Sequence, residues 1–217
     1  VDGLDVVTTL DPDLQDVADK ALRNQLTKQN ALWGTTLVME VRTGEILAMA
    51  NLGRNADGSY SERENYALGR SMEPGSTFKL ATMLALLDDA HLLPATRYDT
   101  YNGDPVQVGP AEDIRDDHRG DRTIDFRRAV AMSSNVYFAR AVWDTYGITG
   151  KKQQFSDFLH NQLHLGEPVG LERLGERPPV VTTDWKVPDP GVMLVKMSYG
   201  YRVQMTPIHM LTFYNAI

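Results

Sequence analysis

An amphipathic helix near the start of the chain is the feature that most constrains its fold. Asp11 precedes Pro12, which is the order of an N-cap followed by a proline at the first helical position. Apolar residues then recur at helical spacing, predicting a helix to about residue 29: Leu14, Val17, Ala18, Ala21, Leu22 and Leu26. Residues 4–10 are rich in β-branched side chains and predict a strand before it. The helix needs a sheet or another helix to cover its apolar stripe.

The next segment supplies a sheet. Residues 35–41 and 45–52 are two apolar runs that flank Arg42-Thr43-Gly44, and this pattern predicts a β-hairpin with Gly44 at the turn. Both runs contain few polar residues. We therefore expect the hairpin to be covered on both faces rather than to face solvent on one.

The rest of the chain alternates helices with irregular segments. We expect a loop over 53–66 and, after Pro74-Gly75, a helix from Ser76 to about Leu92. Residues 94–122 have little periodicity and predict an irregular surface excursion, and residues 166–192, with five prolines, predict an extended loop. The further helices expected from periodicity lie at about 125–132, 135–146 and 150–165 and from Thr206 onward.

Composition excludes several classes of protein. With 22 Lys and Arg against 29 Asp and Glu, the 217 residues carry a net charge of −7, which argues against a nucleic-acid partner. No run of 18 apolar residues predicts a membrane span. The absence of cysteine excludes disulfides, thiol nucleophiles and cysteine metal sites.

A serine and a lysine stand at the start of the central helix. In Glu73–Lys79 (EPGSTFK), Ser76 follows the Pro-Gly break and Lys79 lies three residues on, so the two share one face. A serine hydroxyl is a weak nucleophile that needs a base within hydrogen-bond reach. A lysine serves as that base only when burial or nearby positive charge keeps it neutral. The alternative is an ordinary helix cap, Ser76, with a solvated lysine beside it.

A second polar group, Ser133-Ser134-Asn135, lies between two predicted helices. Ser133 and Asn135 are two residues apart, so a tight turn can point both into one cleft. There Ser133 can relay a proton, and Asn135 can hold a lysine and a substrate amide. Taken alone, the group is more typical of a helix cap, so the functional reading depends on its pairing with Ser76 and Lys79.

Other polar clusters are weaker candidates. His160 and His164 are spaced i, i+4, as in helical metal sites, but no glutamate of a metalloprotease pattern lies between them. The acidic group around Asp116 and Asp117, with Asp113 and His118 beside it, predicts a solvated loop. We therefore expect no metal site.

Taken together, the motifs resemble the penicillin-recognising serine transpeptidases, in which S-x-x-K is paired with S-x-N and later with K-T-G. Four further segments resemble that family, and with them the similarity covers nearly the whole chain: 6–22, 35–51, 166–179 and 197–208. The run Glu73–Leu80 resembles the monofunctional class B penicillin-binding proteins. The closing segment 206–217 resembles the class B enzymes of cell division more than those of elongation.

This resemblance implies an α+β fold with an antiparallel sheet and helices on both faces, and a peptidoglycan D,D-transpeptidase. It implies Ser76 as the nucleophile, Lys79 as general base, Ser133 as proton relay and Asn135 as substrate anchor. The implied ligands are peptidoglycan stem peptides and β-lactams, with no metal or organic cofactor. The implied location is the periplasmic side of the cytoplasmic membrane, reached through an anchor upstream of Val1.

The sequence departs from the family in one motif, because none of its seven lysines is followed by Thr-Gly or Ser-Gly. In the family this strand supplies one of two oxyanion-hole N–H groups. We therefore expect residues 1–217 to be the N-terminal and central part of one transpeptidase domain, cut before its last strands. The hairpin would then have an open edge and an uncovered apolar face, and the affected residues would include Leu37, Met39, Val41, Ile46 and Ala48. The missing strands belong to the rest of the chain or to a second chain.

Two alternatives remain open at this stage. A serine β-lactamase needs a glutamate that holds a deacylating water. Glu167, Glu172 and Glu176 lie in the right region, although none has the E-x-x-x-N context. A β-lactam sensor or structural module without turnover is the other alternative. Retention of Ser76 and Lys79 with Ser133 and Asn135 argues against it.

Overall fold

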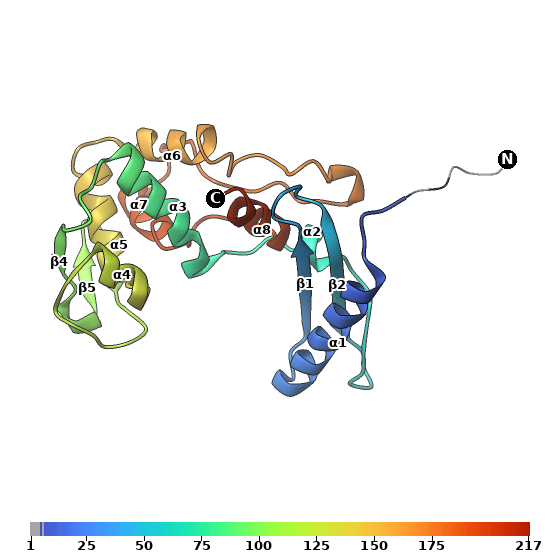
Figure 1. The fold of residues 1–217 in the computed structure, drawn as a ribbon. Coiled ribbons are helices and arrows are strands. Elements are labelled where there is room, and N and C mark those ends of the chain that lie inside the picture. The colour runs from blue at the N-terminus through green and yellow to red at the C-terminus, as the bar shows by residue number, and fades with distance from the viewer. Residues whose placement is uncertain (1–4, 6) are drawn as a thin grey trace. The chain divides into compact units, whose positions relative to one another are not determined.

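The computed structural model describes residue 5 and residues 7–217, and these divide into two compact units. Unit 1 consists of Val1–Ser71, Pro168–Pro178 and Thr206–Ile217, and unit 2 of Met72–Glu167 and Pro179–Met205. Helices and antiparallel strands occur in both (Figure 1). The α+β class expected from the sequence is confirmed.

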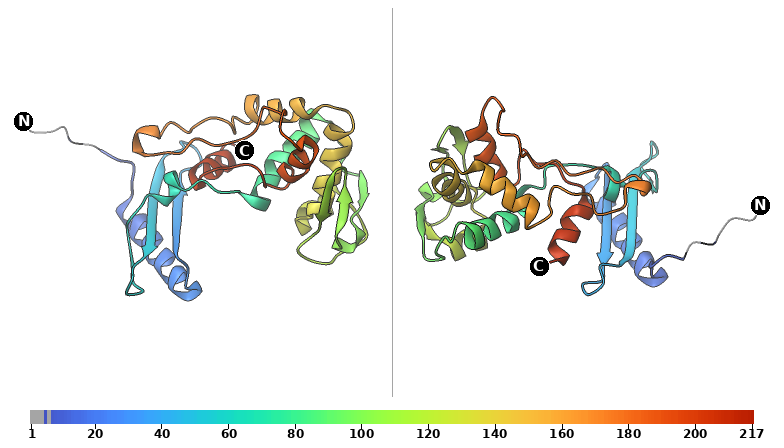
Figure 2. Two further views of the ribbon diagram at one scale, coloured as in Figure 1. Left: turned by 180° about the vertical axis from the view of Figure 1, so that it is seen from behind. Right: turned by 90° about the horizontal axis from the view of Figure 1, so that it is seen from above.

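Unit 1 is built on a three-stranded antiparallel sheet in the order β1-β2-β3, with strands Trp33–Met39, Ile46–Arg54 and Tyr60–Ser61. The expected hairpin is present, and Gly44 adopts a φ of +74° in its turn. Helix α1 (Pro12–Gln29) contacts both long strands of this sheet. Helices α2 (Tyr66–Gly69) and α8 (Pro207–Asn215) also contact β1, and Figure 2 shows α8 on the face opposite α1. The sheet is thus covered on both faces, as predicted.

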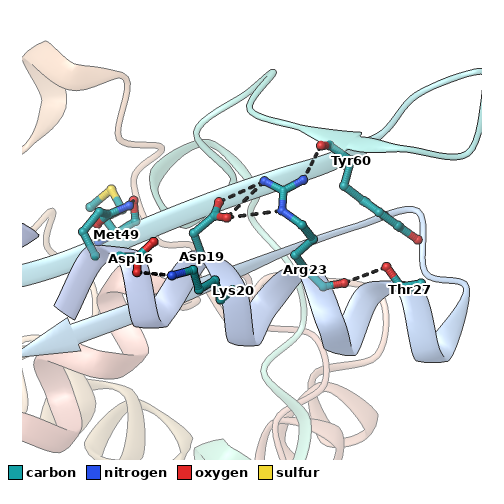
Figure 3. Close-up of polar contacts among 8 residues, drawn as sticks. Asp16, Asp19, Lys20, Arg23, Thr27, Met49 and Tyr60 are labelled. Carbon is teal, nitrogen blue, oxygen red and sulfur yellow. Dashed lines mark hydrogen bonds and ion pairs between the residues drawn. The ribbon is translucent and has the colours of Figure 1, made fainter. Parts of the chain in front are cut away.

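Helix α1 is started by a local capping interaction and is held in place by contacts with distant residues. The Asp11 carboxylate accepts the amide N–H groups of Asp13 and Leu14 at 2.9 and 3.0 Å, as an N-cap should. Arg23 pairs with Asp19 on the same helix and donates to the carbonyl of Tyr60 in β3 (Figure 3). The apolar core beneath α1 contains Ala18, Leu22, Leu26, Ala48, Ala50, Leu52 and Tyr60.

Two expectations for unit 1 are wrong in whole or in part. Of the residues expected on an uncovered apolar face, Ala48 is fully buried against α1 and Leu37, Met39 and Ile46 are partly buried, whereas Val41 is 74% exposed. The predicted strand over 4–10 is absent in residue 5 and residues 7–10, the part of it that the structure describes. The segment meets the outer edge of β2 without a strand ladder: the Thr9 hydroxyl donates to the Ile46 carbonyl at 2.7 Å, and the Gln15 side chain occupies the edge at Met49.

The outer edge of β1 is open within the described residues, since β2 is its strand partner there. The seven residues of β1 contain no charge and no proline, which are the usual protections of an edge. This edge can therefore accept another strand.

A buried polar network fixes the C-terminal helix of unit 1. Glu176 accepts the amides of Val169 and Leu171 at 2.7 Å each, and its Oε1 lies 2.8 Å from Nε2 of His209. The Thr206 amide donates to Nδ1 of His209 at 3.2 Å. His209 is 4% exposed, and this burial lowers its pKa, although the Glu176 carboxylate acts in the opposite direction.

We expect this network to make folding sensitive to acid. A histidine whose folded-state pKa is lowered contributes stability above its unfolded pKa of about 6.5 and loses it as the pH falls below that value. Between pH 8 and pH 5.5, the thermal midpoint of the natural protein should fall further than that of His209→Gln, because only the natural protein must protonate this buried imidazole. Calorimetry at both pH values checks this, and equal falls in the two proteins would contradict it.

Unit 2 is mainly helical. Its helices are α3 (Lys79–Leu84), α4 (Phe126–Met132), α5 (Asn135–Val142), α6 (Lys152–Asn161) and α7 (Pro190–Met197). A 3₁₀ turn (Gly75–Phe78) precedes α3, and π-helical turns extend α3 to Asp89 and α5 to Gly147. Short 3₁₀ turns also occur at Tyr101–Gly103 and, in unit 1, at Glu172–Leu174. Helix α5 is central to this unit, since it contacts α3, α4 and α7.

The region 94–122 is more regular than expected. Strand β4 (Arg97–Asp99) pairs with β7 (Thr123–Asp125), and β5 (Val106–Val108) pairs with β6 (Ala111–Ile114). These strands have three or four residues each, too short for alternation to appear in the sequence. Strands β4, β5 and β6 pack against α5, and β7 packs against α4, so tertiary contacts stabilise these short pairs.

Candidate active site

The loop that carries Ser76 is held by a distant part of unit 2. Met72 forms a β-bridge with Met205, and the Gly75 amide donates to the Gly200 carbonyl at 3.0 Å. Gly200 has a φ of +87°, and a Cβ there would lie 1.9 Å from the Gly75 carbonyl oxygen. Only glycine permits this approach. The segment around Gly200 therefore fixes the backbone immediately before Ser76.

Ser76 lies in the 3₁₀ turn that leads into α3 and is solvent-exposed. Pro74 is the cap residue, and no side chain caps the turn. The interpretation of Ser76 as an ordinary helix cap is thus wrong. Its Oγ instead lies 3.1 Å from Nζ of Lys79, and buried Phe78 anchors the turn between them.

The turn between α4 and α5 brings in the second polar group. Ser133 ends α4 in the left-handed conformation, with φ 54° and ψ 44°, an uncommon state for a residue other than glycine. Ser134 caps α5 by accepting the Tyr137 amide at 3.0 Å. This sharp turn lets Ser133 and Asn135 both reach Lys79, 54 and 56 residues away in sequence.

Lys79 is the centre of the site. Its Nζ lies 3.0 Å from Oγ of Ser133 and 2.7 Å from Oδ1 of Asn135, and it also contacts the Ser133 carbonyl oxygen. The lysine is 5% exposed. Burial lowers the pKa of its ammonium to about 8, while the carboxylates of Asp116 and Asp117 act in the opposite direction. A neutral amine is therefore accessible near physiological pH.

The four partners of Lys79 suit a neutral amine. The Asn135 Oδ1 and the Ser133 carbonyl only accept hydrogen bonds, so they can take both N–H groups of the amine. The lone pair is then available to the two remaining partners, the hydroxyls of Ser76 and Ser133, each of which can donate a proton. The arrangement can activate Ser76 as a nucleophile and exchange a proton with Ser133.

Comparison with known proteins gives the family. The family model described as the penicillin binding protein transpeptidase domain matches residues 34–217. The chain belongs to this family. The expected family resemblance is thereby confirmed.

Individual relatives of this transpeptidase domain agree. It is 27% identical to a probable peptidoglycan D,D-transpeptidase PenA of Neisseria flavescens, over 99% of this chain and 52% of that protein. A peptidoglycan glycosyltransferase structure from Burkholderia ambifaria superposes with a TM-score of 0.79 at 25% identity, covering 97% of this chain and 60% of that one. The transpeptidase domain of Burkholderia pseudomallei penicillin-binding protein 3 superposes with a TM-score of 0.77 at 25% identity, and the match covers 96% of this chain and 57% of that one. The chain thus spans about half the length of these relatives.

Sequence reasoning missed one residue that contacts the Ser133–Asn135 turn. Asp113, Asp117 and His118 are exposed, as a solvated loop predicts, but Asp116 is half-buried. Its carboxylate accepts the Ser134 hydroxyl at 2.8 Å and the Val136 amide at 2.9 Å. The adjacent Arg115 carbonyl accepts Nδ2 of Asn135 at 2.9 Å. No local pattern marks Asp116, because its partners lie 18 and 20 residues away.

The other candidate residues are engaged elsewhere. Nε2 of His160 lies 2.9 Å from the Val181 carbonyl, and Nδ1 of His164 lies 3.5 Å from Glu167. Within residue 5 and residues 7–217, no group of three or more His, Asp or Glu is placed to hold a metal. Both oxygens of Glu176 are occupied in its buried network, so it is not free to position a deacylating water. No helix in the described part of the chain is long and apolar enough to cross a bilayer.

Proposed function

We propose that this protein is a peptidoglycan D,D-transpeptidase that works through an acyl-enzyme on Ser76. The observation that carries the proposal is the contact of buried Lys79 with Ser76, Ser133 and Asn135 at 2.7–3.1 Å, in a chain of the transpeptidase family. The relative named PenA, a probable peptidoglycan D,D-transpeptidase, supports the same activity.

The proposed reaction has two halves. The neutral amine of Lys79 takes the Ser76 proton as Oγ attacks the penultimate D-Ala carbonyl of a stem peptide. Ser133 passes a proton to the leaving D-Ala nitrogen, which departs and leaves an ester on Ser76. An amine of a neighbouring stem then attacks this ester, gives up its proton through the same groups and releases Ser76. Asn135 holds the substrate amide and Lys79. β-Lactams acylate Ser76 as mimics of the D-Ala-D-Ala end.

Two backbone N–H groups would stabilise the oxyanion of the transition state. The Ser76 amide supplies one donor, and we propose that a K-T-G strand, which these 217 residues do not contain, supplies the other. One such donor is typically worth about 3 kcal/mol in the transition state. In this proposal residues 1–217 are the N-terminal and central part of one domain. The missing strands come from the rest of the protein or from a second chain.

The cellular setting is part of the proposal. A peptidoglycan substrate places the enzyme in the cell envelope, on the periplasmic side of the membrane, where an upstream anchor would hold it. The resemblance of residues 73–80 and 206–217 to class B division enzymes supports a role in division rather than elongation.

Product analysis of the whole protein tests the function. With a stem pentapeptide and an amine acceptor, we expect release of D-Ala and formation of the cross-linked peptide. With penicillin we expect a persistent acyl-enzyme. Rapid hydrolysis of penicillin without D-Ala release would indicate a β-lactamase. A persistent penicillin adduct without D-Ala release would indicate a sensor.

The behaviour of residues 1–217 alone is a further prediction. The uncharged open edge of β1 should cause association, because exposed edges pair with other strands. Acylation by penicillin should be slower than in the whole protein by about 100-fold, the effect of one missing oxyanion donor. Light scattering and timed acylation check both points. A stable monomer that acylates at the rate of the whole protein would contradict this account.

A further inference from the structure

The loop that contains Arg115 and Asp116 contacts the active site, although it belongs to neither the S-x-x-K motif nor the S-x-N motif. The Asp116 amide donates to the Gly103 carbonyl at 3.2 Å, and the Gly120 amide donates to the Asn102 carbonyl at 3.1 Å. Backbone bonds on both sides thus hold the loop in place.

From this fixed loop, two groups act on the Ser133–Asn135 turn. The Asp116 carboxylate binds the Ser134 hydroxyl and the Val136 amide, so both of its oxygens are used. The Arg115 carbonyl accepts Nδ2 of Asn135, and this orients the side-chain amide so that its Oδ1 faces Lys79. Ser134 is fully buried, so its hydroxyl has no water to replace the carboxylate.

The turn needs such support. Ser133 is held in the left-handed region, which is unfavourable for a residue with a Cβ. Charge-assisted hydrogen bonds from a carboxylate are stronger than neutral ones and can offset that cost. If the turn relaxed, the Ser133 hydroxyl and carbonyl would both leave Lys79.

We infer that Asp116 is a positioning residue for acylation: its carboxylate clamps the turn in which Ser133 and Asn135 meet Lys79. This inference rests on the proposed function. Asp116 acts through Ser134 and the Val136 amide and makes no contact with Ser76.

The charge of this loop has a second, separable effect. Asp116 and Asp117 are the charged groups that act on Lys79 within the described residues, and both favour its protonated form. The elements packed around Lys79 otherwise present uncharged groups, namely Ser76, the Ser133–Asn135 turn and the Phe138 ring at 5.7 Å. Removing either charge should therefore make Lys79 a base at lower pH.

Three variants of the whole protein separate the clamp from the charge. Ser134→Ala removes a clamp contact, together with the α5 cap to the Tyr137 amide, without changing charge. Asp117→Asn removes a charge without a clamp contact, and Asp116→Asn removes a charge and a clamp contact but keeps the α5 cap. The measurement is the rate of acylation by a fluorescent penicillin from pH 6 to pH 10. For the natural protein we expect the rate to rise with pH as Lys79 loses its proton, with a midpoint near 8.

The expected results differ among the variants. Ser134→Ala should lower the high-pH plateau about 10-fold and leave the midpoint in place. Asp117→Asn should shift the midpoint to lower pH and keep the plateau within about twofold. Asp116→Asn should shift the midpoint in the same direction and lower the plateau about 10- to 100-fold.

A readout that does not depend on activity keeps the inference separate from the proposed function. Titration of the Lys79 signal in protein labelled with ¹³Cε-lysine, assigned with Lys79→Arg, should show the same midpoint shifts. These shifts without acylation of the natural protein would overturn the proposed function and support the placement of Asp116. The inference would be overturned if Asp116→Asn had the same acylation plateau and the same midpoint as the natural protein. It would also be overturned if the lower plateau of Asp116→Asn came with a lower melting temperature and no shift in the Lys79 titration, because the loss would then reflect unfolding.

Discussion

Replacement of Ser76 by alanine should abolish covalent labelling of the whole protein by a fluorescent penicillin. The Ser76 hydroxyl is exposed and lies 3.1 Å from the buried Lys79 amine, and a methyl group in its place cannot form an ester. The loss should be complete within detection, at least about 1000-fold. Gel fluorescence after timed incubation measures it.

Thr77→Val is the matched control for this change. Thr77 lies in the same turn, is also exposed and donates its hydroxyl to the Pro74 carbonyl at 2.7 Å. This variant should retain most of the labelling. Labelling that survives in Ser76→Ala would assign the nucleophile to another residue.

Replacement of Lys79 by arginine should be nearly as damaging as replacement by alanine. Arginine keeps the positive charge, but its guanidinium does not lose a proton in proteins, so it cannot take the Ser76 proton. A general base typically contributes about 100- to 10,000-fold, and both variants should lose acylation rate in that range. The acylation rate constant with excess penicillin is the quantity to compare.

The control for this substitution is Lys186→Arg, which makes the same change at an exposed position. Thermal melting of Lys79→Arg and Lys79→Ala shows whether the buried site still folds around the new side chains. Near-natural acylation in a folded Lys79→Arg protein would mean that Lys79 acts through its charge and that the base lies elsewhere.

Features set by neighbouring residues were predicted from the sequence. The cap at Asp11, the helix that follows and the hairpin around Gly44 depend on contacts within a few residues or across one turn. The same is true of Ser76 and Lys79, which one helical turn brings together. Ser133 and Asn135 were joined to them through a family pattern, because no local rule places residues more than 50 positions apart.

Features set by distant partners were missed. The short strands in 97–114 pack against α5, which is distant from them in sequence. The Asp116 carboxylate accepts a hydrogen bond from the Val136 amide in the first turn of α5. The reverse error occurred at residues 7–10, where β-branched residues predicted a strand that has no partner. Whether such a short segment forms a strand depends less on its local β-propensity than on the surface against which it packs.

The central claim is that Ser76 attacks a stem peptide and releases D-Ala. The most direct measurement mixes the whole protein with a stem pentapeptide, quenches the reaction in acid within seconds and determines the protein mass and the modified residue by tandem mass spectrometry. We expect a mass increase equal to the pentapeptide minus D-Ala, located on Ser76. Release of D-Ala with an adduct on another residue, or with no adduct at any quench time, would contradict the mechanism.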